Sequence, residues 1–243
     1  MTEQTDPTAL PLRAYLLGTL DHDAAWAVQR RLAYEAGDAP PSAAVVLCDH
    51  PSGLTIGRAG SIAHVRLTPD ELAARRWPVR WVARGGGVTL HLPGQVAFYP
   101  VLPLLPLGLT PAGYVTGLCE LVAEVVSGFG PPAVVEPDAV AIRVNGRRVA
   151  TVGVAVRNGV TTGGVVLNVC PDLKPFRDVD CDADPVPMTS VQRECPVRVR
   201  VQSVRQRLLD ALTARFRLGR LSVFHTHPTT LPRATRHASP ARH

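Results

Sequence analysis

The stretch that says most about the fold is Arg84-Gly85-Gly86-Gly87-Val88-Thr89-Leu90-His91-Leu92-Pro93-Gly94-Gln95. Three consecutive glycines accept positive φ and let a backbone approach a ligand closely. The flanking residues predict short strands at Val88–Leu90 and Gln95–Val101, joined by a His-Leu-Pro-Gly turn. The stretch has neither the Gly-Lys-Ser/Thr of a P-loop nor the GxGxxG spacing of a dinucleotide site. We therefore expect a tight glycine turn at one end of a sheet.

Outward from this turn, helical and strand patterns alternate along the chain. Apolar spacing predicts helices at Asp23–Ala36 and Pro111–Ser127, a helix start at Thr68-Pro69-Asp70-Glu71, and a helix around Leu208–Leu212. Further strands are predicted at Ala43–Cys48, Trp77–Val82, Ala139–Val144, Arg148–Arg157 and Thr161–Val169. Asn145-Gly146 is a typical hairpin turn. Helices interleaved with hairpins predict an α+β fold, with a mixed, mostly antiparallel sheet and flanking helices.

Length and composition narrow the class of protein. At about 100–200 residues per domain, we interpret the 243 residues as a flexible segment 1–9, one folded domain 10–221 and a disordered, His/Pro/Arg-rich segment 222–243. No apolar run is long enough to span a membrane, and the polar first residues do not resemble a secretory signal. The net charge is +6, yet we find no module that would bind nucleic acid.

The cysteines indicate the cellular compartment. There are five of them, an odd number with no CxxC pair: Cys48, Cys119, Cys170, Cys181 and Cys195. This pattern disfavours a disulfide framework or a cysteine-based zinc site and favours the cytoplasm. The aspartates around Cys181 lack the glycine and glutamate that an EF-hand loop requires. We predict no metal and no cofactor.

Five blocks in this order resemble the octanoyl (lipoyl) transferase family of lipoate biosynthesis, which has the biotin/lipoate protein-ligase fold. The blocks are His50-Pro51 with Thr55-Ile56-Gly57-Arg58, Arg84–Gln95 with Tyr99-Pro100, Arg148–Gly153, Thr162–Asn168, and Phe176 with Cys181 and Thr189-Ser190. The resemblance covers the chain from about residue 12 to residue 217, nearly all of the predicted domain. The resemblance implies that an octanoyl group moves from acyl carrier protein to a lysine of a lipoyl domain. The acceptors would be the lipoyl domains of 2-oxoacid dehydrogenases or the glycine cleavage H protein.

The resemblance also assigns roles to residues. Cys181 would be the nucleophile that forms an acyl thioester, and Arg148 occupies the position of the family's catalytic lysine. The acyl site would be lined by Arg84, Gly85, Gly86, Gly87, Val88, Thr89, Leu90, His91, Thr151, Val152, Gly153, Gly164, Val165 and Val166. The enzyme would act as a monomer. It would need no ATP, because the acyl group arrives as a thioester.

Three departures from the family pattern fall on the chemistry. Arg148 stays protonated and cannot act as a base, although its charge can favour a thiolate. The family's histidine before its Gly-x-x-Leu-Asn block is Gly163, and its Pro-Cys-Gly is Asp180-Cys181-Asp182. The only lysine, Lys174, could replace the missing one if its loop folded back.

These departures leave two alternatives open. One is a catalytically impaired relative that binds an acyl group or a lipoyl domain. The other is an ATP-using lipoate ligase. The chain resembles that branch of the fold in its third glycine, Gly87, whereas Arg148 argues against it.

Overall fold

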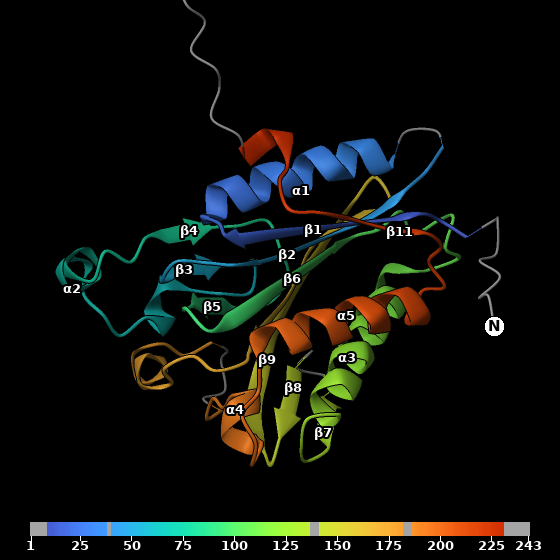
Figure 1. Ribbon diagram of the computed structural model, residues 1–243. Coiled ribbons are helices and arrows are strands. Elements are labelled where there is room, and N and C mark those ends of the chain that lie inside the picture. Colours follow the sequence, from blue (N-terminus) through green and yellow to red (C-terminus); the bar gives the residue numbers. More distant parts are fainter. Residues whose placement is uncertain (1–8, 38–39, 137–140, 182–185, 231–243) are drawn as a thin grey trace, which may run out of the picture.

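The computed structural model describes residues 9–37, 40–136, 141–181 and 186–230 (Figure 1). Its large sheet has eight strands in the order β11-β1-β2-β6-β10-β9-β8-β7. In that order they are Leu221–Phe224, Leu12–Thr19, Ala43–Asp49, Gln95–Val101, Val160–Asn168, Arg147–Arg157, Ala141–Val144 and Ala133–Glu136. A small sheet has the order β4-β3-β5, formed by Val79–Trp81, Gly53–Ile56 and Val88–His91.

The pairing of the strands confirms the predicted mixed, mostly antiparallel sheet. In the large sheet β1 runs parallel to β2 and β11, and the remaining neighbours are antiparallel. In the small sheet β3 is parallel to β4 and antiparallel to β5. The glycine turn leads into β5, so it lies at an edge between the two sheets.

Helices cover both faces of the large sheet (Figure 1). The longer helices are α1 (His22–Ala36), α3 (Pro111–Ser127) and α5 (Val201–Arg215), and the short ones are α2 (Pro69–Ala74) and α4 (Val191–Glu194). Single turns of 3-10 helix are η1 (Ile62–His64), η2 (Lys174–Asp178) and η3 (Pro228–Thr230). The main core lies between the sheet and α3 with α5, and a smaller core lies under α1. A third apolar cluster, which includes Cys181, packs on the small sheet.

Local sequence signals fix several element ends as predicted. Thr68 and Glu71 form a reciprocal capping box at α2, with Pro69 in the first turn. Asn145 and Gly146 both have positive φ, as a two-residue hairpin turn requires. The strands β1, β3, β7 and β11 were not predicted, because each is short or lacks a clear alternating pattern.

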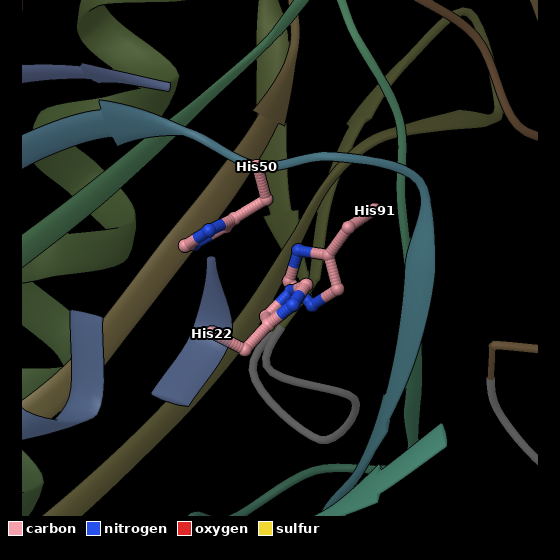
Figure 2. A group of neighbouring side chains, drawn as sticks. All are labelled: His22, His50 and His91. Carbon is pink, nitrogen blue, oxygen red and sulfur yellow. The ribbon is translucent and has the colours of Figure 1, made fainter. Parts of the chain in front are cut away.

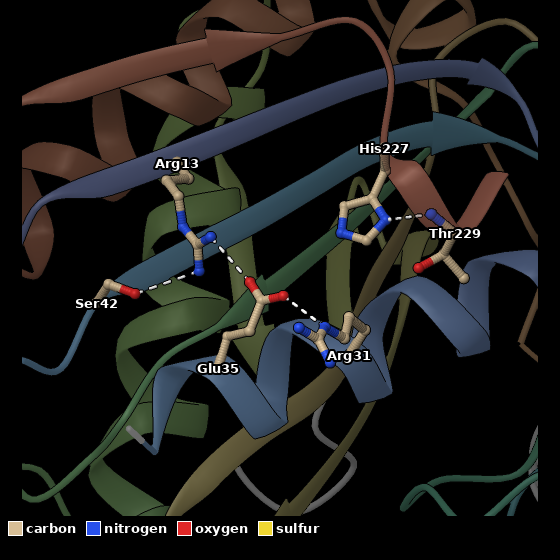
Figure 3. A network of polar contacts seen from close by, with 6 residues as sticks. All are labelled: Arg13, Arg31, Glu35, Ser42, His227 and Thr229. Carbon is tan, nitrogen blue, oxygen red and sulfur yellow. Dashed lines mark hydrogen bonds and ion pairs between the residues drawn. The ribbon is translucent and has the colours of Figure 1, made fainter. Parts of the chain in front are cut away.

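The expectation of disorder from residue 222 on is wrong for residues 222–230. β11 pairs in parallel with β1, and the rings of Phe224 and His227 each lie 5.1 Å from the ring of Tyr15. Figure 3 shows His227 accepting a hydrogen bond from the Thr229 backbone beside α1. Backbone pairing and burial of the Tyr15 ring outweigh the polar composition on which the expectation rested. Residues 1–8 and 231–243 lie outside the described part.

An ion-pair network ties α1 to β1 beside this segment (Figure 3). Glu35 accepts hydrogen bonds from Arg13 at 2.9 Å and from Arg31 at 2.6 Å. Partial burial would raise the pKa of Glu35, but these bonds lower it overall.

No helix within the described ranges has the length and apolar character that crossing a bilayer requires.

Candidate functional site

The glycine turn is held by the side chain of Arg84. Its guanidinium donates to the carbonyl oxygens of Gly85 and Gly87 and to the Thr55 and Thr89 hydroxyls, at 2.8–3.3 Å. The turn also pairs with β9, because the Gly85 amide donates to Val154 at 2.8 Å. A Cβ on Gly153 of β9 would lie 2.6 Å from the Arg84 side chain. Glycine at that position therefore makes room for the buried arginine.

A small cavity of about 30 Å³, with several polar side chains in its wall, lies next to Arg84, between α1 and the strands β9 and β10. Its walls include seven of the residues predicted to form the acyl site, which are Arg84, Thr89, His91, Thr151, Gly153, Gly164 and Val166. Gly163 also lines it. A volume this small holds a water molecule or an ion, whereas ligand sites usually measure about 300–1,000 Å³.

The other predicted acyl-site residues lie elsewhere, as the period of two along a strand dictates. Val88 and Leu90 are buried in the cluster on the small sheet. Val165 and Val152 pack in or against the main core. Gly85, Gly86 and Gly87 form the turn itself, and Gly86 has positive φ.

Three buried histidines line the small cavity (Figure 2). They are His22 at the start of α1, His50 after β2 and His91 at the end of β5. The rings of His22 and His50 stack at 4.2 Å, and the ring of His91 lies edge-on to both. Burial lowers the pKa of His22 to about 3, and it also lowers the pKa of His50 and of His91. All three imidazoles are therefore neutral at pH 7.

A second, much larger cavity of about 780 Å³ holds both residues predicted to be catalytic. Cys181 is 7% exposed and Arg148 is 3% exposed, and both side chains line it. Its apolar wall is formed by Leu173, Phe176, Val179 and Met188. The size of this cavity suits a ligand. The sequence placed the room for a ligand at the glycine turn, whereas the structure has most of it at Cys181.

Backbone hydrogen bonds join Arg148 to the segment that follows Cys181. The Arg148 amide donates to Pro187 at 2.9 Å, and the Thr189 amide donates to Arg148 at 2.8 Å. Thr189 also accepts a bond from the Asn168 side chain at 3.0 Å, and Asn168 accepts one from Gln95 at 2.8 Å. Four of the motif blocks thus meet in one buried network, which fixes β9 against the Cys181 loop.

Glu194 closes this network from α4. Its carboxylate accepts bonds from Asn145 and Arg147 at 2.9 Å and from the Thr189 hydroxyl. Burial acts to raise the pKa of Glu194, but these three hydrogen bonds lower it overall. The ionised carboxylate therefore ties the β8–β9 hairpin to the loop.

Two aspartates that precede Cys181 in the sequence form ion pairs. Asp180 is paired with the Arg66 guanidinium, and Asp178 is paired with Arg75 at 2.8 Å. Asp182 and Asp184 lie outside the described residues. Lys174 also lines the cavity, so the loop does bring the only lysine to the same space as Cys181.

Gly163 explains one departure from the family pattern. Its φ is +72°, and a Cβ there would lie 2.2 Å from the Gly153 carbonyl oxygen. Its amide donates to Gln29 of α1 at 2.8 Å. The backbone of this chain therefore excludes the histidine that the family carries at this position.

Sequence reasoning missed His22, Arg66 and Glu194. His22 lies outside the five blocks, and Arg66 and Glu194 meet their partners only through the tertiary fold. The one available signal was the position of His22 at a helix start capped by Asp21.

Comparison with known proteins agrees with this architecture. Residues 21–213 match the model of the Lipoyl protein ligase A/B catalytic domain. The Octanoyltransferase of Chloroflexus aggregans is 37% identical over 211 residues, which cover 85% of this chain and 96% of that protein. The Octanoyltransferase of Syntrophobacter fumaroxidans is 37% identical over 185 residues, covering 74% of this chain and 81% of that protein.

Solved structures match the fold. A lipoate-protein ligase A bound with ATP has a TM-score of 0.71 at 14% identity, covering 90% of this chain and 91% of that chain. A bipartite lipoate protein ligase from Thermoplasma acidophilum has a TM-score of 0.69 at 15% identity, covering 88% of each chain. The predicted resemblance is thus confirmed: the chain belongs to the lipoyl protein ligase A/B catalytic domain family, and its relatives at 35–38% identity are octanoyltransferases.

Proposed function

We propose that this protein transfers an octanoyl group from acyl carrier protein to a lysine of a lipoyl domain, through an acyl thioester on Cys181. The observation that carries the proposal is the single cavity lined by Cys181 and Arg148, in a chain whose relatives are octanoyltransferases. Among the described cysteines, only Cys170 also lines that cavity. The reaction needs no ATP, because the donor is already a thioester.

In the first step the Cys181 thiolate attacks the carbonyl carbon of the octanoyl thioester. The bond to the carrier sulfur breaks, and the carrier thiolate takes a proton from solvent. Arg148 favours the thiolate and the negative charge that develops on the carbonyl oxygen. It cannot exchange a proton at neutral pH, so its role is electrostatic.

In the second step the neutral amine of the acceptor lysine attacks the Cys181 thioester. The new amide forms as the carbon–sulfur bond breaks, and the amine proton passes to the departing sulfur or to solvent. Because Arg148 is not a base, the proton acceptor is the thiolate itself, water or Lys174. The free Cys181 is restored for another cycle.

The strand β9 connects the two cavities. Arg148 lines the Cys181 cavity, and Thr151 and Gly153 line the small one. At about 3.3 Å per residue, the Cα atoms of Arg148 and Thr151 are about 10 Å apart. We propose that the acyl chain runs from Cys181 along β9 toward this wall, which the predicted residues Arg84, Thr89, His91, Gly164 and Val166 complete.

Charge at the cavity favours acidic carrier domains. Arg66, Lys174, Arg177 and Arg193 line the Cys181 cavity, against the carboxylates Asp172 and Asp180. Such an excess of positive charge accelerates encounter with acidic partners at low salt. We propose that the enzyme acts as a monomer. We also propose that it acts in the cytoplasm, which its odd number of cysteines without a CxxC pair favours.

The test is turnover with purified octanoyl carrier protein and an unmodified lipoyl domain, followed by the mass of the acceptor. Cys181→Ser should abolish octanoylation, whereas the matched control Cys170→Ser should retain it. If the wild type binds the lipoyl domain without octanoylating it, the protein is the catalytically impaired relative instead. A requirement for ATP would point to a ligase.

A further inference from the structure

The three-histidine cluster has unused hydrogen-bonding capacity that acyl transfer does not explain. His22 Nε2 and His91 Nδ1 are buried, and neither has a hydrogen-bond partner among the residues that the structure describes. A buried polar atom without a partner is costly, so each such group calls for a ligand or an ordered water. One ring nitrogen from each of His22, His50 and His91 lies within 4.8 Å of the other two.

We propose that His22, His50 and His91 form a binding site for a divalent transition metal ion, with Zn²⁺ as its probe. Neutral imidazole is a favoured ligand of Zn²⁺, Cu²⁺ and Ni²⁺. Three protein ligands leave a fourth position for water. The adjoining cavity of about 30 Å³ has room for that ion and little more.

The surroundings of the rings are those of metal-binding histidines. His50 Nδ1 donates to the Leu20 carbonyl at 2.6 Å, which fixes the tautomer with its lone pair on Nε2. His91 Nε2 lies 2.9 Å from the Thr55 hydroxyl. When Nε2 carries the proton and donates it to this hydroxyl, the lone pair of His91 is on Nδ1. His50 and His91 each have one nitrogen held by the protein, and the partnerless nitrogens of the cluster are His22 Nε2 and His91 Nδ1.

Binding requires a modest rearrangement. Nitrogens around a tetrahedral Zn²⁺ are about 3.4 Å apart, so the three rings must close in from their present spacing. The metal would replace the hydrogen bond between His50 Nε2 and the Tyr99 hydroxyl, which are 2.8 Å apart. Because the rings of His22 and His50 are stacked within 22° of parallel, their in-plane lone pairs meet at one ion only after a ring rotates.

The electrostatic field at the cluster is mixed. Arg84 opposes positive charge at His22 and His91. Asp23 favours it at His22, and Asp49 and Asp21 favour it at His50. The sequence did not suggest this site, because its ligands come from three separate segments.

The test is metal binding by the full-length protein, stripped with a chelator and free of any acyl donor. Zn²⁺ is titrated in competition with a chromophoric chelator, and Co²⁺ is added separately to record its visible spectrum. We expect one Zn²⁺ site per chain. In His22→Phe and His22→Gln the affinity for Zn²⁺ should fall by at least about 100-fold, because loss of a residue that only supports a ligand usually costs no more than that. X-ray absorption of the Zn²⁺-loaded wild type should show three imidazole ligands.

The control variant His225→Ala/His237→Ala/His243→Ala removes histidines near the C-terminus and should bind as the wild type does. Equal affinity in the His22 variants and the wild type would overturn the proposal, as would loss of binding in the control variant. Fewer than three imidazoles in the absorption spectrum would also overturn it. Because no acyl donor is present, the result is independent of whether Cys181 catalyses transfer.

Discussion

Acidification should destabilise the protein through its buried histidines, and His22 allows the size of the effect to be worked out. Burial lowers the pKa of His22 from 6.5 to about 3. As the pH falls below about 6.5, the unfolded chain binds a proton at this histidine and the native state does not. The free energy of unfolding therefore decreases between about pH 6.5 and pH 3.

From pH 7.0 to pH 5.5, linkage gives a loss of about 1.3 kcal/mol for one histidine that is neutral in the native state and titrates near 6.5 when unfolded. His50 and His91 also have lowered pKa values and add to the total loss. The variant His22→Phe lacks the first contribution, so its loss should be about 1.3 kcal/mol smaller than that of the wild type.

The assay is urea unfolding at the two pH values, in the presence of a chelator so that no metal contributes. Only the difference between the pH values matters, because the substitution also changes packing against His50. The control His225→Phe removes an exposed histidine and should keep the wild-type loss. Equal losses in the wild type and His22→Phe would refute the argument that burial holds His22 neutral.

Three further changes probe the site and the fold. Arg148→Met should slow alkylation of Cys181 at pH 7 by about tenfold, because it removes the charge that favours the thiolate, while Arg148→Lys should not. The rate is measured by peptide mapping with mass spectrometry. An unchanged rate in the Met variant would contradict the electrostatic role. Gly163→His should lower stability by at least about 2 kcal/mol, since its Cβ would lie 2.2 Å from a carbonyl oxygen of β9; a wild-type melting temperature would show that β9 and β10 are not so close. A chain truncated after Arg220 should melt at a lower temperature than a chain truncated after Thr230, because β11 and the rings packed on β1 are lost. Equal melting temperatures of the two truncated chains would contradict the docking of this segment.

The parts of the fold that sequence predicts are those set by local chemistry. The capping box of Thr68 and Glu71 and the hairpin turn at Asn145-Gly146 are specified within four residues, and both are present. The order of the motif blocks also gave the family and the mixed sheet. These signals depend on residue type and spacing alone.

The parts that sequence could not predict depend on how side chains fill space. The glycine turn indicated an open acyl site, but Arg84 and three histidines occupy most of that space. Asp180 appeared as a carboxylate beside Cys181, yet Arg66, 114 residues away, pairs with it. Such contacts are set by the packing of distant segments.

The most direct test of the account is the mass of the intact protein after incubation with octanoyl carrier protein and no acceptor. We predict an adduct of about 126 Da, mapped to Cys181, that disappears when a lipoyl domain is added and reappears on its lysine. Transfer to the acceptor in the absence of any adduct, or an adduct mapped to Cys170 with Cys181 unmodified, would contradict the assignment of Cys181 as the nucleophile.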